Sequence, residues 1–517
     1  MAQSASDAKG SKAVSDAARV LLVSPPSRAF NHYRPPLALM YLSGYLKHNG
    51  IDARVIDICL HEQIRTKTFE QNRERFRRQV EDETVARIRT EETDIIGITC
   101  YTPELEESIQ LAKRIKEIKP HARLIVGGIH PTLYPEHFLE PDAIFDFAVV
   151  GEGELTLLEL VRAIRAGNAD FTKVAGIAYR DSATGNPVIT PVRPVLENLD
   201  DVVFPDYDDL DMEYYTTASP YSVRGVFVRS FYTAASRGCP SSCTFCVAKQ
   251  LRDHQGPRHF TRIRSAKSLA AEVLHLRERY AIDGFYFIDD LFTLKKPVVL
   301  EFCELLQQSK VRLLWGCSSK VNTVNFEMLK AMRDAGCVQI DFGVEKGSDA
   351  ALRSIQKGVT VAQVRNAFDL CHQLGIRTFA NMLVNTPGEV EQDLEDILSL
   401  LRELRSEIVS INTFTPYPGC EIYDGMYQPV TRAEYDLLMK PPYELIKQLP
   451  ERFRFAKHQV DFESWTATWM HKTNHTAANA AFFFDPRYLA AILASRRKAN
   501  YLAQLISLAR EFINQKF

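Results

Sequence analysis

Residues 236–248 read SRGCPSSCTFCVA and place three cysteines in one short loop. Cys239, Cys243 and Cys246 have the spacing C-x3-C-x2-C. The residues just before them, 231–236, are mostly apolar and predict a short buried strand. The cysteines therefore fall on the loop at the carboxyl end of a strand, and the rest of the chain can be placed relative to this loop.

Three thiolates in one loop can hold three corners of an iron–sulfur cube. A [4Fe–4S] cluster normally takes four protein ligands, but the next cysteine in the chain is Cys303. One iron would therefore stay open for a substrate or cofactor. Zinc is the weaker alternative, because a structural zinc site needs four ligands and usually two C-x2-C pairs.

The N-terminal part, residues 18–195, alternates between strand and helix patterns. Near-continuous apolar runs predict strands, and 3.6-residue periodicity between them predicts helices. Such a pattern indicates a doubly wound, Rossmann- or flavodoxin-like parallel sheet covered on both faces. Residues 168–195 would close this domain as a hairpin. The predicted strands are 19–26, 53–60, 94–101, 122–128 and 145–151, and the predicted helices are 37–50, 61–93, 105–120 and 155–167.

Ligands of doubly wound sheets bind at the carboxyl ends of the strands. Glycines there let the backbone approach a large planar or phosphorylated ligand. On the residues alone this could be any nucleotide or cofactor domain, or a domain without a ligand. The candidate contact residues at this edge are Thr99, Tyr101, Gly127, Gly128, His130, Gly151, Glu152 and Gly153.

A second alternating region spans residues 225–424, after an acidic, turn-rich linker at 196–224. Six strand-plus-helix units predict a partial (β/α)6 barrel. Polar residues end several of these strands, and the active sites of barrels lie at this end. They could also be ordinary caps. The candidates are Asp289, Asp290, Lys320 and Glu345.

Residues 425–517 change character and predict a small helical C-terminal domain with aromatic clusters. The pattern favours a helical cap on the barrel mouth. Alternatively, the aromatic residues, among them Trp465 and Trp469, line a pocket for a lipid-like or aromatic substrate.

The cysteine loop, with Phe245 before its last cysteine, resembles the radical S-adenosylmethionine (SAM) superfamily. The resemblance implies that the open iron chelates the amino and carboxylate groups of SAM and that Phe245 lies near the adenine. It also places Asp289 and Asp290 near the SAM amino group, Glu345 on its ribose or amino group, and Lys320 on its carboxylate. One departure is E-K-G-S at 345–348, where the family usually has E-S-G-S.

The segments PPLALMYLSGYLKHNG, VGGIHPTLYPE and VVGEGELTLLEL resemble the cobalamin-binding domain of cobalamin-dependent radical SAM enzymes. The D-x-H-x-x-G motif of the better-known cobalamin carriers is absent: Asp57 is followed by His61 at the wrong spacing. The resemblance therefore implies cobalamin without a protein histidine below the cobalt, and His130 is interpreted as a loop residue.

The family resemblance implies methylation of an unactivated carbon, or of a phosphinate phosphorus, through methylcobalamin and a 5′-deoxyadenosyl radical. Cobalamin-dependent cyclisation or ring rearrangement without methyl transfer is the alternative, because the same motifs serve both. An iron–sulfur redox sensor is a distant third. The implied partners are a small-molecule substrate, for which a hydrophobic molecule is one alternative, and an electron donor such as flavodoxin or ferredoxin.

The net charge and the cysteines indicate which partners and which cellular compartment to expect. A formal net charge of −2 gives no support for nucleic-acid binding. No apolar run approaches the ~20 residues of a membrane span, and residues 1–17 predict a disordered lead-in rather than a secretory signal. Ten scattered cysteines suit reduced thiols in the cytoplasm better than a disulfide framework.

Overall fold

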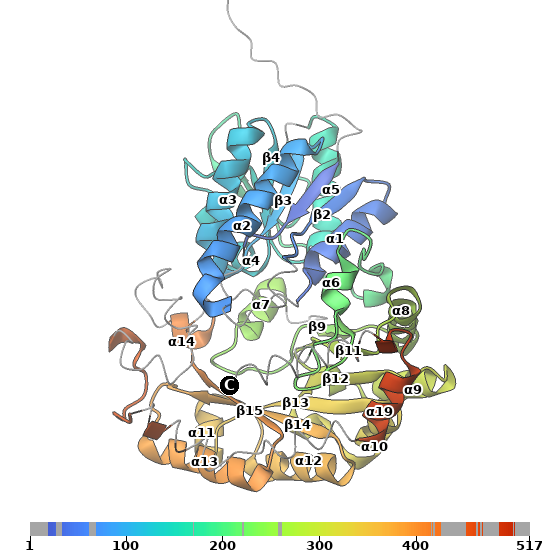
Figure 1. The fold of residues 1–517 in the computed structure, drawn as a ribbon. Helices are drawn as coiled ribbons and strands as arrows, with labels where there is room; N and C mark the ends of the chain where they lie inside the picture. The colour runs from blue at the N-terminus through green and yellow to red at the C-terminus, as the bar shows by residue number, and fades with distance from the viewer. Residues whose placement is uncertain are drawn as a thin grey trace, which may run out of the picture.

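The computed structural model describes residues 19–26, 34–60, 69–168, 170–219, 222–256, 261–414, 416, 419–424, 451–461, 464–465, 468, 485–499 and 501. The predicted lead-in at 1–17 and most of the predicted C-terminal domain at 425–517 lie outside these residues. Two sheets, each in its own domain, dominate the fold. In Figure 1 the N-terminal domain (blue to cyan) lies above the barrel domain (yellow to orange).

The N-terminal sheet has the strand order β2-β1-β3-β4-β5-β6-β7. Strands β1 to β5 are parallel, and β6 and β7 are added as an antiparallel hairpin. The order 2-1-3-4-5 is that of flavodoxin-like sheets, so the prediction of a doubly wound sheet is confirmed. The strands are Val20–Val23, Ala53–Ile56, Ile95–Thr99, Arg123–Gly127, Phe147–Val149, Ile177–Arg180 and Pro187–Ile189.

Helices cover both faces of this sheet, because successive strand residues point to opposite sides. Leu21 and Val23 of β1 pack into one apolar cluster, whereas Val20 and Leu22 pack into the other. The helices are α1 (Leu37–His48), α2 (Phe69–Thr90), α3 (Leu105–Ile118), α4 (Ile129–Leu133) and α5 (Gly153–Arg165). The short helix α4 follows β4 directly and did not emerge from the sequence pattern.

The barrel sheet has six parallel strands in the order β15-β14-β13-β12-β11-β8. Within the described residues β8 and β15 remain separate edges, so this is the predicted partial barrel. Its strands are β8 (Ser230–Thr233), β11 (Gly284–Phe287), β12 (Leu314–Ser319), β13 (Cys337–Glu345), β14 (Arg377–Val384) and β15 (Ile408–Thr413).

Helices lie on the outside of the barrel sheet (Figure 1). A buried aromatic cluster, with Trp315 stacked on Phe285 at 5.7 Å between ring centroids, fills the layer between sheet and helices. The helices are α8 (Ala266–Tyr280), α9 (Lys296–Gln308), α10 (Phe326–Asp334), α11 (Asp349–Ser354), α12 (Val361–Gln373) and α13 (Glu391–Leu404). A small antiparallel pair, β9 (Ser236–Arg237) and β10 (Arg262–Ile263), precedes and follows the cysteine loop and α7 (Ala248–Gln255).

The segment 196–224 packs against both domains. The Tyr215 hydroxyl donates to Asp57 of the N-terminal domain at 2.8 Å, and the Tyr207 hydroxyl donates to Glu272 on the barrel helix α8 at 2.5 Å. Its one α-helix among the described residues is α6 (Met212–Thr216). The segment is therefore a packed connection that fixes one domain to the other.

The described parts of the C-terminal region lie at opposite ends of the barrel. Residues 451–461 lie at the carboxyl end, where Asn385 after β14 bonds the backbone of Phe453 and Phe455. The helix α19 (Pro486–Ala494) lies at the amino end, where Tyr488 donates to the Phe227 carbonyl at 2.9 Å. The prediction that the whole region caps the barrel mouth is therefore wrong for the described residues 485–499 and 501. No helix among the described residues is long and apolar enough to cross a membrane.

Candidate functional site

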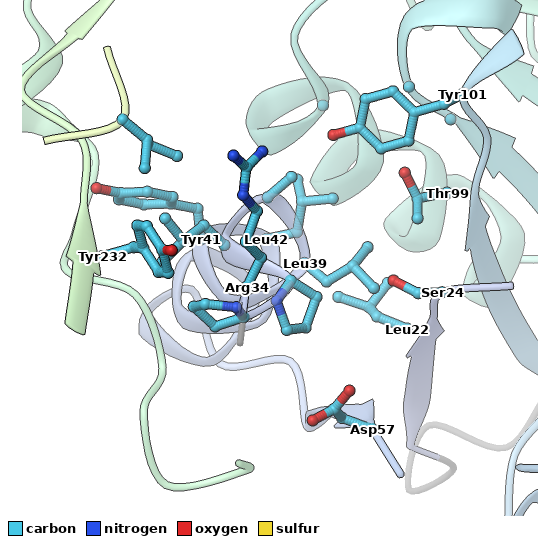
Figure 2. Close-up of a pocket in the computed structure, with 18 of the residues that line it drawn as sticks. Leu22, Ser24, Arg34, Leu39, Tyr41, Leu42, Asp57, Thr99, Tyr101 and Tyr232 are labelled. Atoms are coloured by element: carbon cyan, nitrogen blue, oxygen red, sulfur yellow. The ribbon is translucent and has the colours of Figure 1, made fainter. Parts of the chain in front are cut away.

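A cavity of about 880 Å³ lies between the carboxyl edges of the two sheets. Residues after β1, β3, β4 and β5 line one side of the cavity, and residues of β8, β11, β12, β13 and β14 line the other. Figure 2 shows Tyr232 from the barrel facing Tyr101, Thr99 and Ser24 from the N-terminal domain across this space. Both edges predicted to carry ligands therefore open into one shared space.

Seven of the eight residues proposed at the N-terminal edge line this cavity, namely Thr99, Tyr101, Gly127, Gly128, Gly151, Glu152 and Gly153. The edge also supplies residues that the sequence did not single out. Arg34, just before α1, and Tyr41, on α1, point into the cavity in Figure 2. Tyr41 belongs to the segment PPLALMYLSGYLKHNG, but neither residue was predicted as a cavity contact.

The glycines leave room for a large flat group. Gly128 has a φ of +116°, and an added Cβ would lie 2.7 Å from the Cys100 carbonyl oxygen, so only glycine fits there. A Cβ on Gly127 would meet Val149 at an ordinary 3.7 Å. Gly127 therefore has space on the protein side and keeps the cavity wall free of a side chain. This bare edge at the carboxyl end of β4 suits a planar macrocycle.

His130 is not one of the lining residues. It is buried, and both ring nitrogens face side chains of the same domain: Nδ1 is 3.1 Å from the Thr102 hydroxyl and Nε2 is 3.1 Å from His137. Burial, with a smaller contribution from the neighbouring His137, lowers the pKa of His130 to about 4. The structure thus places this histidine in a packed loop, away from the cavity.

The three cysteines lie between β9 and α7, beginning two residues after the cavity-lining Arg237. Cys243 is buried, and Cys239 and Cys246 are partly exposed. The thiols interact electrostatically with one another. Burial raises the pKa of Cys246 to about 11, and it also raises that of Cys243, which the Lys357 and Lys320 ammonium groups oppose.

Two lysines beside the loop suit an anionic centre of thiolates. The raised pKa values of Cys243 and Cys246 mean that burial disfavours their thiolate forms. A bound metal cluster would stabilise the thiolates and offset this effect. Among the described residues, no three His, Cys, Asp or Glu side chains lie close enough to bind a single metal ion. The three thiols of one loop, with Lys320 and Lys357 beside them, fit a cluster that takes one thiolate at each of three corners.

Phe245 packs at the edge of a small apolar cluster made of Leu383, Phe414, Cys420 and neighbours, among them Phe455. The Lys357 ammonium lies 5.8 Å from the centre of the Phe245 ring. The aromatic residue of the cysteine loop is thus backed by the ends of β14 and β15 and by the 451–461 segment.

Glu345 ends β13 next to the cysteine loop, and its carboxylate accepts a hydrogen bond from Lys357 at 2.8 Å. Lys357 follows α11 and has no sequence signal that marks it as part of a site. Burial lowers the pKa of Lys357, but Glu345 and the cysteines more than offset this, so the pKa is raised. Lys357, Glu345 and Cys243 therefore form one charged group beside the loop.

The two aspartates after β11 differ. Asp289 is buried, and its carboxylate accepts from the Ala235 backbone N–H at 2.9 Å and from the Ser236 hydroxyl. Burial raises the pKa of Asp289 to about 6, although these hydrogen bonds oppose the shift. Asp290 is exposed and lies within electrostatic range of Cys246. Lys320 donates to Ser241 inside the cysteine loop at 3.1 Å.

Ion pairs join the two domains beside the cavity. Arg237 pairs with Glu154, and Arg262 pairs with Glu152, so two arginines of the β9–β10 pair bind two glutamates at the start of α5. Burial raises the pKa of Glu154, but Arg237 more than offsets this and the net shift is downward. Glu152, proposed from the sequence as a cobalamin contact, thus lines the cavity while its carboxylate binds arginine.

Comparison with known proteins agrees with this architecture. Residues 28–161 match the B12 binding domain, and residues 234–401 match the radical SAM superfamily. The chain is 30% identical over 409 residues to the anaerobic magnesium-protoporphyrin IX monomethyl ester cyclase of Rubrivivax gelatinosus, which covers 78% of this chain and 68% of the relative. It is 29% identical over 417 residues to an uncharacterized methyltransferase of Pyrococcus horikoshii, covering 78% and 82%.

The solved structure of the radical S-adenosylmethionine methyltransferase TsrM from Kitasatospora setae, with cobalamin and a [4Fe–4S] cluster bound, superposes with a TM-score of 0.62. It covers 88% of this chain and 90% of TsrM at 17% identity, which shows a shared fold. The bare glycine edge, the three-thiol loop and these matches lead to one conclusion. The chain belongs to the cobalamin-dependent radical SAM enzymes, and its cofactors are cobalamin, S-adenosylmethionine and a [4Fe–4S] cluster.

Proposed function

We propose that the enzyme transfers a methyl group to an unactivated carbon, or to a phosphinate phosphorus, of a small molecule bound in the interdomain cavity. The observation that carries this proposal is the cavity itself. It adjoins the bare carboxyl edge of the N-terminal sheet on one side and reaches Arg237, two residues from Cys239, on the other. A substrate there would lie between the methyl donor and the source of the radical.

The bound cofactors supply a methyl group and a radical able to open a C–H bond, which acid–base side chains cannot do. The residues of the chain bind and orient. Cys239, Cys243 and Cys246 would hold the cluster, and Phe245 would pack near the adenine. Gly127 and Gly128 would let the backbone approach cobalamin.

For SAM, Glu345, Asp290 and Lys320 are the residues best placed beside the cysteine loop. Asp289 has a different role in this proposal. Since both of its oxygens already accept hydrogen bonds from Ala235 and Ser236, it positions the strand end from which the cysteine loop starts. The electron needed for radical formation would come from a small carrier of the flavodoxin or ferredoxin type.

Cyclisation without methyl transfer is the second candidate, because the relative from Rubrivivax gelatinosus is named a cyclase. Methylation is favoured by the relative from Pyrococcus horikoshii, which is named a methyltransferase and of which the chain covers the larger share, 82%. The residues described here serve either chemistry, so the two candidates require an experiment.

The experiment uses SAM with a trideuterated methyl group and needs no substrate. Reconstituted enzyme with cobalamin and a low-potential reductant is incubated with the labelled SAM, and the cobalamin is then extracted for mass spectrometry. A methyltransferase should return cobalamin carrying the CD3 group. Unlabelled cobalamin together with free 5′-deoxyadenosine would contradict methylation and support the cyclase alternative. A variant with all three cysteines changed to alanine should form no deoxyadenosine.

A further inference from the structure

The part of the cavity inside the barrel is polar, which the expectation of a hydrophobic substrate did not anticipate. Side chains of four neighbouring strands form its wall here: Tyr286 of β11, Ser318 of β12, Asp341 of β13 and Asn381 of β14. Ser318 and Asp341 are direct neighbours in the strand register, and the Tyr286 hydroxyl lies 3.0 Å from the Ser318 hydroxyl. These residues lie below the strand ends, within the barrel.

Asp341 is the charged residue of this wall and is only 5% exposed. One carboxylate oxygen accepts from the Gln339 side chain at 2.8 Å, and Gln339 in turn accepts from Arg377 at 2.9 Å. The Tyr286 hydroxyl also hydrogen-bonds the Asp341 carboxylate. The second oxygen lies 4.0 Å from Nε of Arg224, too far for a hydrogen bond. Burial raises the pKa of Asp341, which Arg224 opposes.

Arg224 also lines the cavity. Its guanidinium stacks over the Phe379 ring at 4.4 Å, and its backbone carbonyl accepts from Arg377 at 3.0 Å. The stacking on Phe379 holds the guanidinium beside Asp341 without a close ion pair. The cavity therefore presents a carboxylate and a guanidinium 4.0 Å apart. Each of the two groups can form further hydrogen bonds with a ligand.

The hydrogen bonds that the buried Asp341 accepts from Gln339 and Tyr286 come from neutral groups, and a buried charge is costly unless an opposite charge pairs with it. The Arg224 side chain is 41% exposed, so its guanidinium is accessible to a ligand. A ligand that brings both a cationic donor and an anionic acceptor would satisfy both groups at once. From this geometry we infer that the substrate enters the barrel with a dipolar head group of the α-amino-acid type, its ammonium on Asp341 and its carboxylate on Arg224. Tyr286, Ser318 and Asn381 would add neutral hydrogen bonds.

This inference rests on the proposed function only in that the substrate reacts in this cavity, and it is tested by binding, without turnover. The probes are L-phenylalanine, phenethylamine, which lacks the carboxylate, and 3-phenylpropionate, which lacks the ammonium. Each is titrated calorimetrically into the cluster- and cobalamin-loaded enzyme. L-phenylalanine should bind about tenfold or more tightly than either truncated probe, because each loses a hydrogen bond to a charged group.

Two variants separate the two charges. Asp341→Asn keeps an oxygen for Gln339 and removes the charge, so L-phenylalanine and 3-phenylpropionate should bind alike. Arg224→Gln should make L-phenylalanine and phenethylamine bind alike. Glu403→Gln, at the surface pair with Arg365, should keep the wild-type affinities and their ranking.

Equal binding of all three probes, no binding by any, or an unchanged ranking in Asp341→Asn would overturn the inference. Methyl loading of cobalamin from labelled SAM needs no substrate, so it reports separately on the proposed function. Intact loading with failed probe binding would contradict only the head-group assignment.

Discussion

Glu345 owes its direction to a distortion of β13. The register with β14 shifts between Gly343 and Glu345, and Glu345 has a φ of +70°. A left-handed conformation in a residue other than glycine costs about 1–2 kcal/mol, and such strain is typical of functional sites. The ion pair with Lys357 at 2.8 Å helps to hold the side chain beside Cys243.

Glu345→Gln keeps the size and the strained backbone but removes the charge. If Glu345 contacts SAM, the change should weaken SAM binding by about tenfold, since a hydrogen bond to a charged group contributes about 1.5–3 kcal/mol. Equilibrium dialysis with the cluster-reconstituted protein measures this. Glu403→Gln, at a surface pair with Arg365, is the control and should bind SAM like the wild type. Equal affinity in both variants would remove Glu345 from the SAM site.

His130 makes a prediction about pH. Its pKa is about 4 in the fold and about 6.5 in an unfolded chain. Above pH 6.5 both states are neutral; as the pH falls from 6.5 to 4, only the unfolded state gains the proton, so the fold loses stability in that window. The loss can reach about 1.4 kcal/mol per pH unit.

His130→Gln cannot take up a proton, so its thermal midpoint should fall less steeply than that of the wild type between pH 6.5 and 4. Circular dichroism melts at constant ionic strength follow both proteins. The carboxylates titrate equally in the wild type and in the variant. The contribution of His130 is therefore the difference between the two slopes of thermal midpoint against pH. Parallel curves would show that His130 does not titrate in this way.

At the scale of elements, a buried network of hydrogen bonds and ion pairs holds the segment 451–461. The network includes Lys346, the residue at which E-K-G-S (345–348) differs from the usual E-S-G-S of the family. Lys346 is 1% exposed and pairs with Glu389, and Glu389 also lies 2.9 Å from Nε2 of His458. Asn385 adds bonds to the backbone of the same segment. Because Phe455 of this segment packs in the cluster that backs Phe245, the network supports the cysteine loop from behind.

Glu389→Ala would leave the Lys346 ammonium buried without its carboxylate, which typically costs about 3–5 kcal/mol. The variant should melt at a clearly lower temperature, and residues 451–461 should be cut faster by a protease. Glu389→Gln retains an acceptor and should lose less. Glu403→Ala, at an exposed pair, should shift the midpoint little. A wild-type melting curve for Glu389→Ala would contradict the role of the network.

The sequence predicted the elements well because apolar periodicity is a local property. The strands β1 to β5 and the helices α1, α3 and α5 lie within a few residues of the predicted ranges. Helix α4 was not predicted, because a helix of five residues is too short to show a 3.6-residue periodicity. Three side chains beside the cysteine loop or in the cavity wall were not predicted, namely Lys357, Arg224 and Arg34. They lie on loops, and contacts between loops that are distant in the sequence leave no local pattern.

Residue chemistry alone also could not assign Glu152 and Asp289 to their partners. Both are acidic residues at strand or helix ends, where ligands bind, and both instead bind protein groups. Glu152 pairs with Arg262, which is 110 positions away, and Asp289 bonds Ser236, which is 53 positions away. Such long-range pairing follows from the tertiary fold.

At the scale of the whole molecule, the two sheets face each other because several contacts fix the domains. The segment 196–224 bonds both, and the Arg237–Glu154 and Arg262–Glu152 pairs lie beside the cavity itself. Arg237 is two residues from Cys239, and Glu154 lies in the first turn of α5, which follows β5 at the carboxyl edge of the N-terminal sheet. These ion pairs therefore tie the cluster loop directly to the cobalamin domain.

The double variant Glu152→Gln and Glu154→Gln removes both pairs without altering the cluster loop. Cobalamin content, iron content and release of 5′-deoxyadenosine should stay within about twofold of the wild type. The rate at which the CD3 group of SAM reaches cobalamin should fall by roughly tenfold or more, because small misplacements of reacting groups cost about that much. Arg19→Gln, whose pairs with Asp52 and Glu91 lie within the N-terminal domain, should load at the wild-type rate. An unchanged loading rate in the double variant would show that the segment 196–224 alone holds the two cofactor sites in register.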